Sequence, residues 1–362
     1  MKPLATQPWI GNPLTDSLFI LMPPFICVLL VFLFPGIFQQ QTGMSDAWWV
    51  VLILLVDVAH VYSTLYKTYF DKTAYQQHRT KLLLIPFMAF TAMVLLYTQS
   101  ALWFWRLLAY TAVYHFIRQQ YGFMRIYSRK EKSSPFIKKI DALTIYASTI
   151  YPILFWHLSG NRNFTWFTDN DFIDLSFAAG IIKILSIIYV LLLAGYIVKE
   201  CWLLINRHPF NLPRNAVVLG TAASWYMGIV YFNGDMAFTL LNVISHGIPY
   251  MALVWMYGKK TVRQQPVKAG KLMRQVFSKY GLLLFLGIIF LLAYIEEGLW
   301  DVALWQQHRN VFGLFNLMDK KPADVVLAIL VPLLALPQVT HYIIDGFIWR
   351  INKNDLEWAN QT

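Results

Sequence analysis

The sequence predicts an all-α fold, a polytopic bundle of about ten transmembrane helices. Hydrophobic residues make up 57% of the 362 positions, and charged residues only 14%, whereas soluble domains are usually about 25% charged. A soluble core of this size cannot enclose so much apolar surface, so lipid is the expected solvent. The spacing of apolar runs and the distribution of basic residues support the same interpretation.

Apolar runs recur along the whole chain at a length that suits a bilayer, whose core takes roughly 20 residues of helix to cross. No low-complexity linker interrupts them, so we expect one integral membrane domain over residues 1–362. The expected spans, in order, are 17–38, 46–66, 81–99, 101–124, 139–158, 175–199, 215–232, 236–257, 280–296 and 324–349.

The basic residues predict the orientation of these spans. Lys and Arg gather in the connections after the second, fourth, sixth, eighth and tenth runs, whereas the opposite connections carry only Arg162, Arg309, Lys320 and Lys321. Cytoplasmic connections hold such an excess, so we expect a cytoplasmic membrane, the inner membrane of a bacterium, with both termini in the cytoplasm. The formal charge of +11 then serves topology and contact with anionic lipid, and nucleic acid is not an expected partner.

Two connections are expected to lie at the membrane surfaces. In the segment 259–279, Met273, Val276 and Phe277 share one helical face, which is typical of an amphipathic helix in the cytoplasmic interface. The segment 297–323 is rich in Trp and Phe, and it predicts a cap at the outer interface.

Histidines inside the expected spans are the most informative feature of the sequence. Four of the eight lie on the second, fourth, eighth and tenth spans, which all run from the outside to the cytoplasm. With 1.5 Å of rise per residue they lie roughly 15–25 Å from the outer ends. A shared depth in the cytoplasmic half allows these residues to converge: His60, His115, His246 and His341.

Polar neighbours accompany these histidines. Asp57 precedes His60 by one turn and Asp345 follows His341 by one turn, so each pair shares a helix face. Polar groups are costly in hydrocarbon and therefore face the bundle interior. We expect the two aspartates to act as a catalytic base, a fifth metal ligand or an orienting partner of the histidines. Three more side chains are expected to act in catalysis or to orient water and substrate: Arg118, Gln119 and Asn242.

The histidine layer predicts a metal site. Imidazole is a good ligand for iron, zinc and copper, and several imidazoles with an open position suit Fe(II) and oxygen. Zn(II) with three imidazoles and a water is the alternative, and it would suit lipid hydrolysis. A titrating layer without metal would suit a transporter or a proton relay, and haem between two histidines an electron carrier. Hydrogen bonding between helices is a purely structural alternative.

A multi-span helical chain with isolated histidines at positions 60, 115, 246 and 341 resembles the bacterial Brp/Blh carotenoid dioxygenases. The resemblance implies a non-haem iron held by the intramembrane histidines and oxidative cleavage of β-carotene to retinal. The sequence departs from that family's close histidine pair, because Tyr250 and Asp345 stand four residues after His246 and His341. The adiponectin-receptor and ceramidase superfamily, with zinc among histidines near the inner leaflet, is similar in a looser way. The expected partners are membrane lipids and a hydrophobic small-molecule substrate; the sequence names no protein partner.

Overall fold

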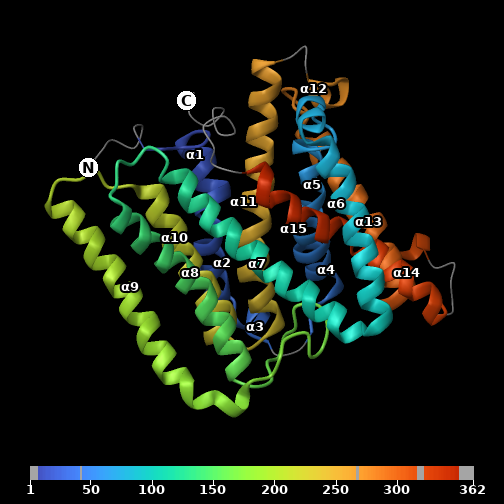
Figure 1. The fold of residues 1–362 in the computed structure, drawn as a ribbon, viewed down its shortest axis with the longest axis horizontal. Helices are drawn as coiled ribbons and strands as arrows, with labels where there is room; N and C mark the ends of the chain where they lie inside the picture. Colours follow the sequence, from blue (N-terminus) through green and yellow to red (C-terminus); the bar gives the residue numbers. More distant parts are fainter. Residues whose placement is uncertain (1–6, 41–42, 266–268, 316–321, 350–362) are drawn as a thin grey trace. The chain divides into compact units, whose positions relative to one another are not determined.

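Helices supply all the regular secondary structure of residues 7–40, 43–265, 269–315 and 322–349, which are the residues that the computed structural model describes (Figure 1). The predicted all-α fold is therefore confirmed for this part of the chain. The chain divides into two compact units. Among the described residues, unit 1 takes in those up to 43 and 113–249, and unit 2 takes in 44–112 and 250–349.

The helices have the length and apolarity of an integral membrane protein. A further pair of helices, Pro13–Leu21 and Pro23–Leu33, would make one more span with a bend of 52°. The expected runs at 101–124, 139–158 and 215–232 are helical but less apolar, so the prediction of about ten spans is not confirmed. Six described helical stretches could cross a membrane: Asp46–Lys67, Lys72–Gln99, Ser176–Ile205, Asp235–Gln264, Leu282–Trp305 and Asp324–Ile348.

Unit 1 contains the N-terminal helices, the helices of the middle of the chain and parts of two long helices that continue into unit 2. Side-chain caps set two of its helix starts: Ser134 caps α8 and Asn211 caps α10, each accepting a backbone N–H of the first turn. Its elements are α1 (Pro13–Asp16), η2 (Ser17–Leu21), α2 (Pro23–Leu33), α3 (Pro35–Phe38), the second half of α7 (Ala101–Tyr127), α8 (Pro135–Leu158), η5 (Ser176–Ile181), α9 (Ile182–Ile205), α10 (Leu212–Trp225), η6 (Tyr226–Tyr231) and the first half of α11 (Asp235–Gln264).

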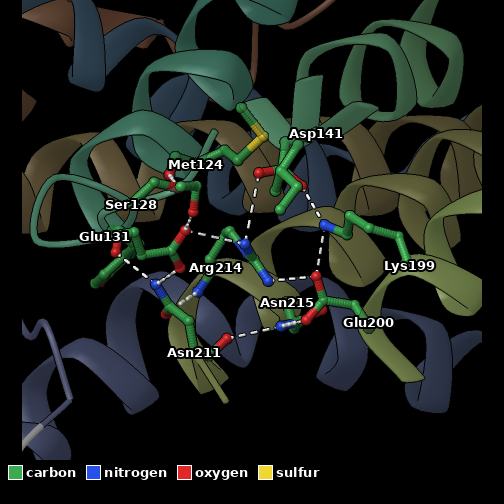
Figure 2. A network of polar contacts seen from close by, with 12 residues as sticks. Met124, Ser128, Glu131, Asp141, Lys199, Glu200, Asn211, Arg214 and Asn215 are labelled. Atoms are coloured by element: carbon green, nitrogen blue, oxygen red, sulfur yellow. Dashed lines mark hydrogen bonds and ion pairs between the residues drawn. The ribbon is translucent and has the colours of Figure 1, made fainter. Parts of the chain in front are cut away.

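Helices α8, α9 and α10 of unit 1 pack side by side (Figure 1) and enclose a group of buried charges. Arg214 forms ion pairs with Glu131, Asp141 and Glu200, and Lys199 pairs with Asp141 and Glu200 (Figure 2). We call these five residues the ion-pair network. Buried charges are tolerated when they are paired, and every charge in this set has at least one partner of opposite sign.

Unit 2 contains the other helices. The stretch from Asp46 to Lys67 includes a nine-residue π-helical segment, and α6 begins where the Asp71 carboxylate accepts the N–H groups of Thr73 and Ala74. Its elements are α4 (Asp46–Trp49), η3 (Val50–Val58), α5 (Ala59–Ser63), η4 (Thr64–Lys67), α6 (Lys72–Gln99), the first half of α7, the second half of α11, α12 (Lys271–Val276), α13 (Leu282–Trp300), η7 (Asp301–Trp305), η8 (Gly313–Phe315), α14 (Asp324–Leu334) and α15 (Leu336–Ile348).

The two expected surface segments are folded onto unit 2 where they are described. In 259–279, α11 continues to Gln264, and the short helix α12 follows with Met273, Val276 and Phe277 buried; residues 266–268 lie outside the described residues. In 297–323, α13 continues to Trp300, whose ring packs on Trp305; residues 316–321 lie outside the described residues.

Candidate metal centre

Unit 2 holds one pair of the predicted histidines. His60 lies on α5, directly after the π-helical segment η3, and His341 lies on α15. π-Helical turns are rare and often occur at functional sites. Pro337, which has no N–H to donate, stands in the first turn of α15 and marks the break from α14. Both imidazoles are buried, and their ring centroids are 5.1 Å apart.

Hydrogen bonding determines which nitrogen of His60 can bind a metal. Its Nδ1 lies 3.2 Å from the Val56 carbonyl oxygen, and the nearest oxygen of Asp57 is 3.9 Å from the same nitrogen. A carbonyl oxygen can only accept, so Nδ1 carries the proton and donates it. The lone pair of His60 is therefore on Nε2, which is the arrangement expected of a histidine that binds metal through Nε2.

For His341, a chain of hydroxyl groups determines which ring nitrogen carries the proton. Tyr250 donates its O–H to Asp345 Oδ1 at 2.6 Å, and Thr64 Oγ1 lies 2.8 Å from the Tyr250 oxygen and 2.7 Å from His341 Nδ1. Each hydroxyl has one proton to give. Because Tyr250 gives its proton to Asp345, Thr64 donates to Tyr250, and His341 Nδ1–H donates to Thr64. The Nε2 atom of His341 therefore carries the lone pair.

Unit 1 holds the second pair of histidines. His115 on α7 and His246 on α11 are buried, with ring centroids 5.0 Å apart. The ring of Phe116 stacks on His246 with a centroid distance of 3.5 Å and an angle of 8° between the planes. This stacking fixes the plane of the His246 ring, because rotation about χ2 would lose the contact.

Amide side chains support the backbone around His246. Gln119 Nε2 donates to the His246 carbonyl oxygen at 2.8 Å, and Gln120 Nε2 donates to the Ser245 carbonyl oxygen at 3.3 Å. Pro249 cannot donate to Ser245, so Gln120 replaces the missing helix hydrogen bond. Asn242 is buried, and its Nδ2 donates to the carbonyl oxygen of Phe238.

All four histidines predicted from the sequence are buried, one pair in each unit. We call His60, His115, His246 and His341 the four-histidine group. Buried imidazoles of this kind could hold a metal ion, and their neutral nitrogens suit iron, zinc or copper.

The predicted carboxylates lie on the Nδ1 side of their histidines. Asp57 Oδ1 is 3.9 Å from His60 Nδ1, and Asp345 Oδ1 is 3.7 Å from His341 Nδ1. Since the lone pairs are on Nε2, this geometry suits an orienting role better than that of a fifth ligand. Arg118 is exposed, donates to the Tyr146 hydroxyl at 2.6 Å and lies over the ring of Tyr121, so its described contacts do not involve the histidines.

Several residues near the histidines were missed at the level of sequence. Thr64 and Tyr250 each lie four residues after a predicted ligand, His60 and His246, and that helical spacing was the signal available. Glu296 and Glu297 are two buried carboxylates within the apolar α13. Tyr62 donates to Glu296 at 2.5 Å, and acidic residues inside an apolar run are themselves a functional signal.

A pocket of about 330 Å³ in unit 2 reaches His341. Its walls are mostly apolar, with polar groups from a few threonines and tyrosines such as Thr64 and Tyr69. Leu333 lines the pocket and is 49% exposed, so the pocket adjoins the surface that unit 2 presents to lipid. We call it the His341 pocket; other lining residues include Leu65, Leu336, Pro337 and Ile344.

Comparison with known proteins gave no relative: no family model matches the chain, and no curated protein or solved structure matches it. The resemblance to the Brp/Blh dioxygenases therefore stays a prediction from the sequence. What the chain can do has to be inferred from its own residues.

Proposed function

We propose that this protein is an intramembrane metalloenzyme, a non-haem iron oxygenase acting on a lipid or isoprenoid substrate. The observation that carries the proposal is the buried His60–His341 pair of unit 2, whose ring centroids are 5.1 Å apart and whose Nδ1 atoms are held by Val56 and Thr64. Unit 1 holds a second buried pair, His115 and His246, with ring centroids 5.0 Å apart.

Iron fits the donor set. Imidazole suits Fe(II), and oxygenases leave coordination positions open for oxygen and substrate. Iron, when bound, would supply the oxygen chemistry. The chain's own contribution is to hold the ligands in one tautomer, as Val56 does for His60 and as Thr64 does for His341. Zn(II) is the alternative metal, since four nitrogens also meet its tetrahedral preference.

The His341 pocket supports an apolar substrate. It adjoins the lipid-exposed surface of unit 2, its walls are mostly apolar, and His341 itself is among its lining residues. A lipid or isoprenoid chain could enter from the bilayer without crossing water. We further propose the bacterial inner membrane as its location, about ten spans and cytoplasmic termini, on the strength of the basic connections.

An oxygen-uptake assay tests this proposal. Detergent-purified protein loaded with Fe(II) should consume oxygen when β-carotene or another isoprenoid is added. Leu336→Trp, which fills the His341 pocket, should lower the uptake while the iron content stays the same. Val325→Trp is the matched control, because Val325 is an exposed residue of the same span and does not line the pocket. Equal uptake by both variants would contradict entry through the His341 pocket.

A proton relay is the second candidate. The hydrogen bonds from His341 through Thr64 and Tyr250 to Asp345 form a continuous chain of proton-bearing groups. Such chains are typical of intramembrane proton pathways. Proton flux into liposomes that contain the metal-free protein would favour the relay, whereas flux at the level of empty liposomes would favour the enzyme.

A further inference from the structure

A second pocket, of about 370 Å³, lies in unit 1 and does not involve the histidines. Its size falls within the usual range of small-molecule sites, which is roughly 300–1,000 Å³. Residues of the α7–α8 connection, the end of α9 and the α9–α10 connection line it. We call it the Lys130 pocket; the charged and titratable residues in its lining are Lys130, Glu131, Lys132, Glu200, His208 and Arg214.

The base of the Lys130 pocket is negative and its mouth is positive. At the base, Glu131, Glu200 and Arg214 belong to the ion-pair network, where three carboxylates face two cations and leave a formal charge of −1 (Figure 2). At the mouth, Lys130 and Lys132 are exposed. This order of charge complements a zwitterion that holds an ammonium group inward and a phosphate outward.

One wall of the Lys130 pocket is apolar and continues into a membrane-facing helix. Leu203 and Leu204 line the pocket at the end of α9, and Leu204 is 43% exposed. The candidate span Ser176–Ile205 ends at the same place, so the pocket lies at the level where hydrocarbon gives way to headgroups. An acyl chain could therefore run along α9 while its headgroup fills the pocket.

We propose that the Lys130 pocket binds the headgroup of an aminophospholipid such as phosphatidylethanolamine. Lys130 and Lys132 hold the phosphate, and Glu131 and Glu200 accept the ammonium group. Leu204 packs against the first part of the acyl chain. This site is independent of the proposed metal centre, and it would link the α7–α8 connection, α9 and α10 at one membrane surface.

Native mass spectrometry of the full-length protein in detergent tests the proposal. Phosphatidylethanolamine, phosphatidylglycerol and phosphatidylcholine are added at equal concentration, and we expect phosphatidylethanolamine to be retained best. The double variant Lys130→Ala/Lys132→Ala should bind it about fivefold less for each lysine removed. Lys138→Ala/Lys139→Ala is the matched control, because these exposed lysines do not line the pocket, and its binding should be unchanged.

The other outcomes would overturn the proposal. Equal retention of phosphatidylcholine, or undiminished binding by the Lys130→Ala/Lys132→Ala variant, would exclude recognition of the headgroup. Preference for phosphatidylglycerol would exclude the ammonium site at Glu131 and Glu200. Free phosphoethanolamine binding as tightly as the lipid would assign the pocket to a soluble ligand. Glu131→Gln supplies a second check, since it should reduce the preference for phosphatidylethanolamine over phosphatidylglycerol.

Discussion

The ion-pair network of unit 1 and the His60–His341 pair of unit 2 are both buried and polar, but they differ in how neighbouring groups engage their polar atoms. In the network, Arg214 and Lys199 bind carboxylates directly, and Asn211 and Asn215 donate to the same carboxylates. In the histidine pair, the neighbouring groups engage Nδ1 of each ring, and the lone pairs are on Nε2.

The difference separates a cluster of paired charges from a candidate metal site. Burial alone would lower the pKa of Arg214, but the nearby Tyr196, Glu131, Asp141 and Glu200 outweigh it and raise that pKa. Arg214 therefore stays charged and paired at any ordinary pH. The histidine pair is built of neutral donors in a fixed tautomer, which is how proteins prepare imidazole for a metal.

Removing Arg214 should have the largest effect on stability. Arg214→Ala leaves Glu131, Asp141 and Glu200 with one cation, and breaking a buried ion pair in this way costs about 3–5 kcal/mol. Thermal unfolding in detergent should show a large fall in Tm for this variant. Arg274→Ala removes an exposed arginine of α12 and should leave Tm nearly unchanged. Equal Tm values for the two variants would show that the network contributes little.

Removing the Tyr250 hydroxyl should weaken metal binding more than stability. Tyr250→Phe interrupts the hydrogen bonds between Thr64 and Asp345, and the loss of such an outer partner usually lowers metal affinity about 10–100-fold. Competition with a chelator measures the change. Tyr257→Phe is the matched control, because Tyr257 also lies on α11 and donates to an aspartate, Asp71. Equal losses in both variants would contradict the role given to Tyr250.

Neutralising Asp57 should have a smaller effect. Its carboxylate is 3.9 Å from His60 Nδ1, beyond hydrogen-bonding distance, and Val56 already accepts from that nitrogen. A weak charge interaction of this kind is worth at most about fivefold in affinity. Asp57→Asn should therefore retain metal in the same chelator titration, and complete loss would instead identify Asp57 as a ligand.

Replacing Arg118 should have the smallest effect. The side chain is exposed, and its described contacts are with Tyr146 and Tyr121. Arg118→Gln should leave both metal content and substrate-dependent oxygen uptake at the level of the unmodified protein. A clear loss of uptake would restore Arg118 to the catalytic role expected from its spacing to His115.

The sequence predicts the parts of this molecule that follow from helical rise and from composition. Counting residues along each span was enough to expect His60, His115, His246 and His341 at one depth, because depth depends on rise alone. The link from Thr64 to Tyr250 depends on how α11 is rotated about its own axis, which no spacing within one helix determines. The π-helical segment Val50–Val58 changes that rotation for α5 as well. The count of about ten spans was not confirmed, because α7, α8 and α10 are not among the described helices that are long and apolar enough to cross a membrane.

The histidine pairs also show why the sequence leaves the role of Asp345 open. Its position one turn after His341 allows either direct metal binding or a hydrogen-bonding role. Tyr250, from another helix, accepts a hydrogen bond from Thr64 and donates its own to Asp345. The choice between the two roles therefore depends on a residue about 95 positions away in the chain, which local spacing does not reveal.

The most direct test of the four-histidine group is elemental analysis of the detergent-purified protein, with an ultraviolet–visible spectrum recorded on the same sample. We predict about one iron per chain without the Soret band of haem, and loss of that iron in His246→Ala and His341→Ala. His208→Ala, which removes an exposed histidine, should keep the iron. The account would be contradicted if no metal bound after reconstitution with Fe(II) or Zn(II), or if metal survived in all four single histidine variants.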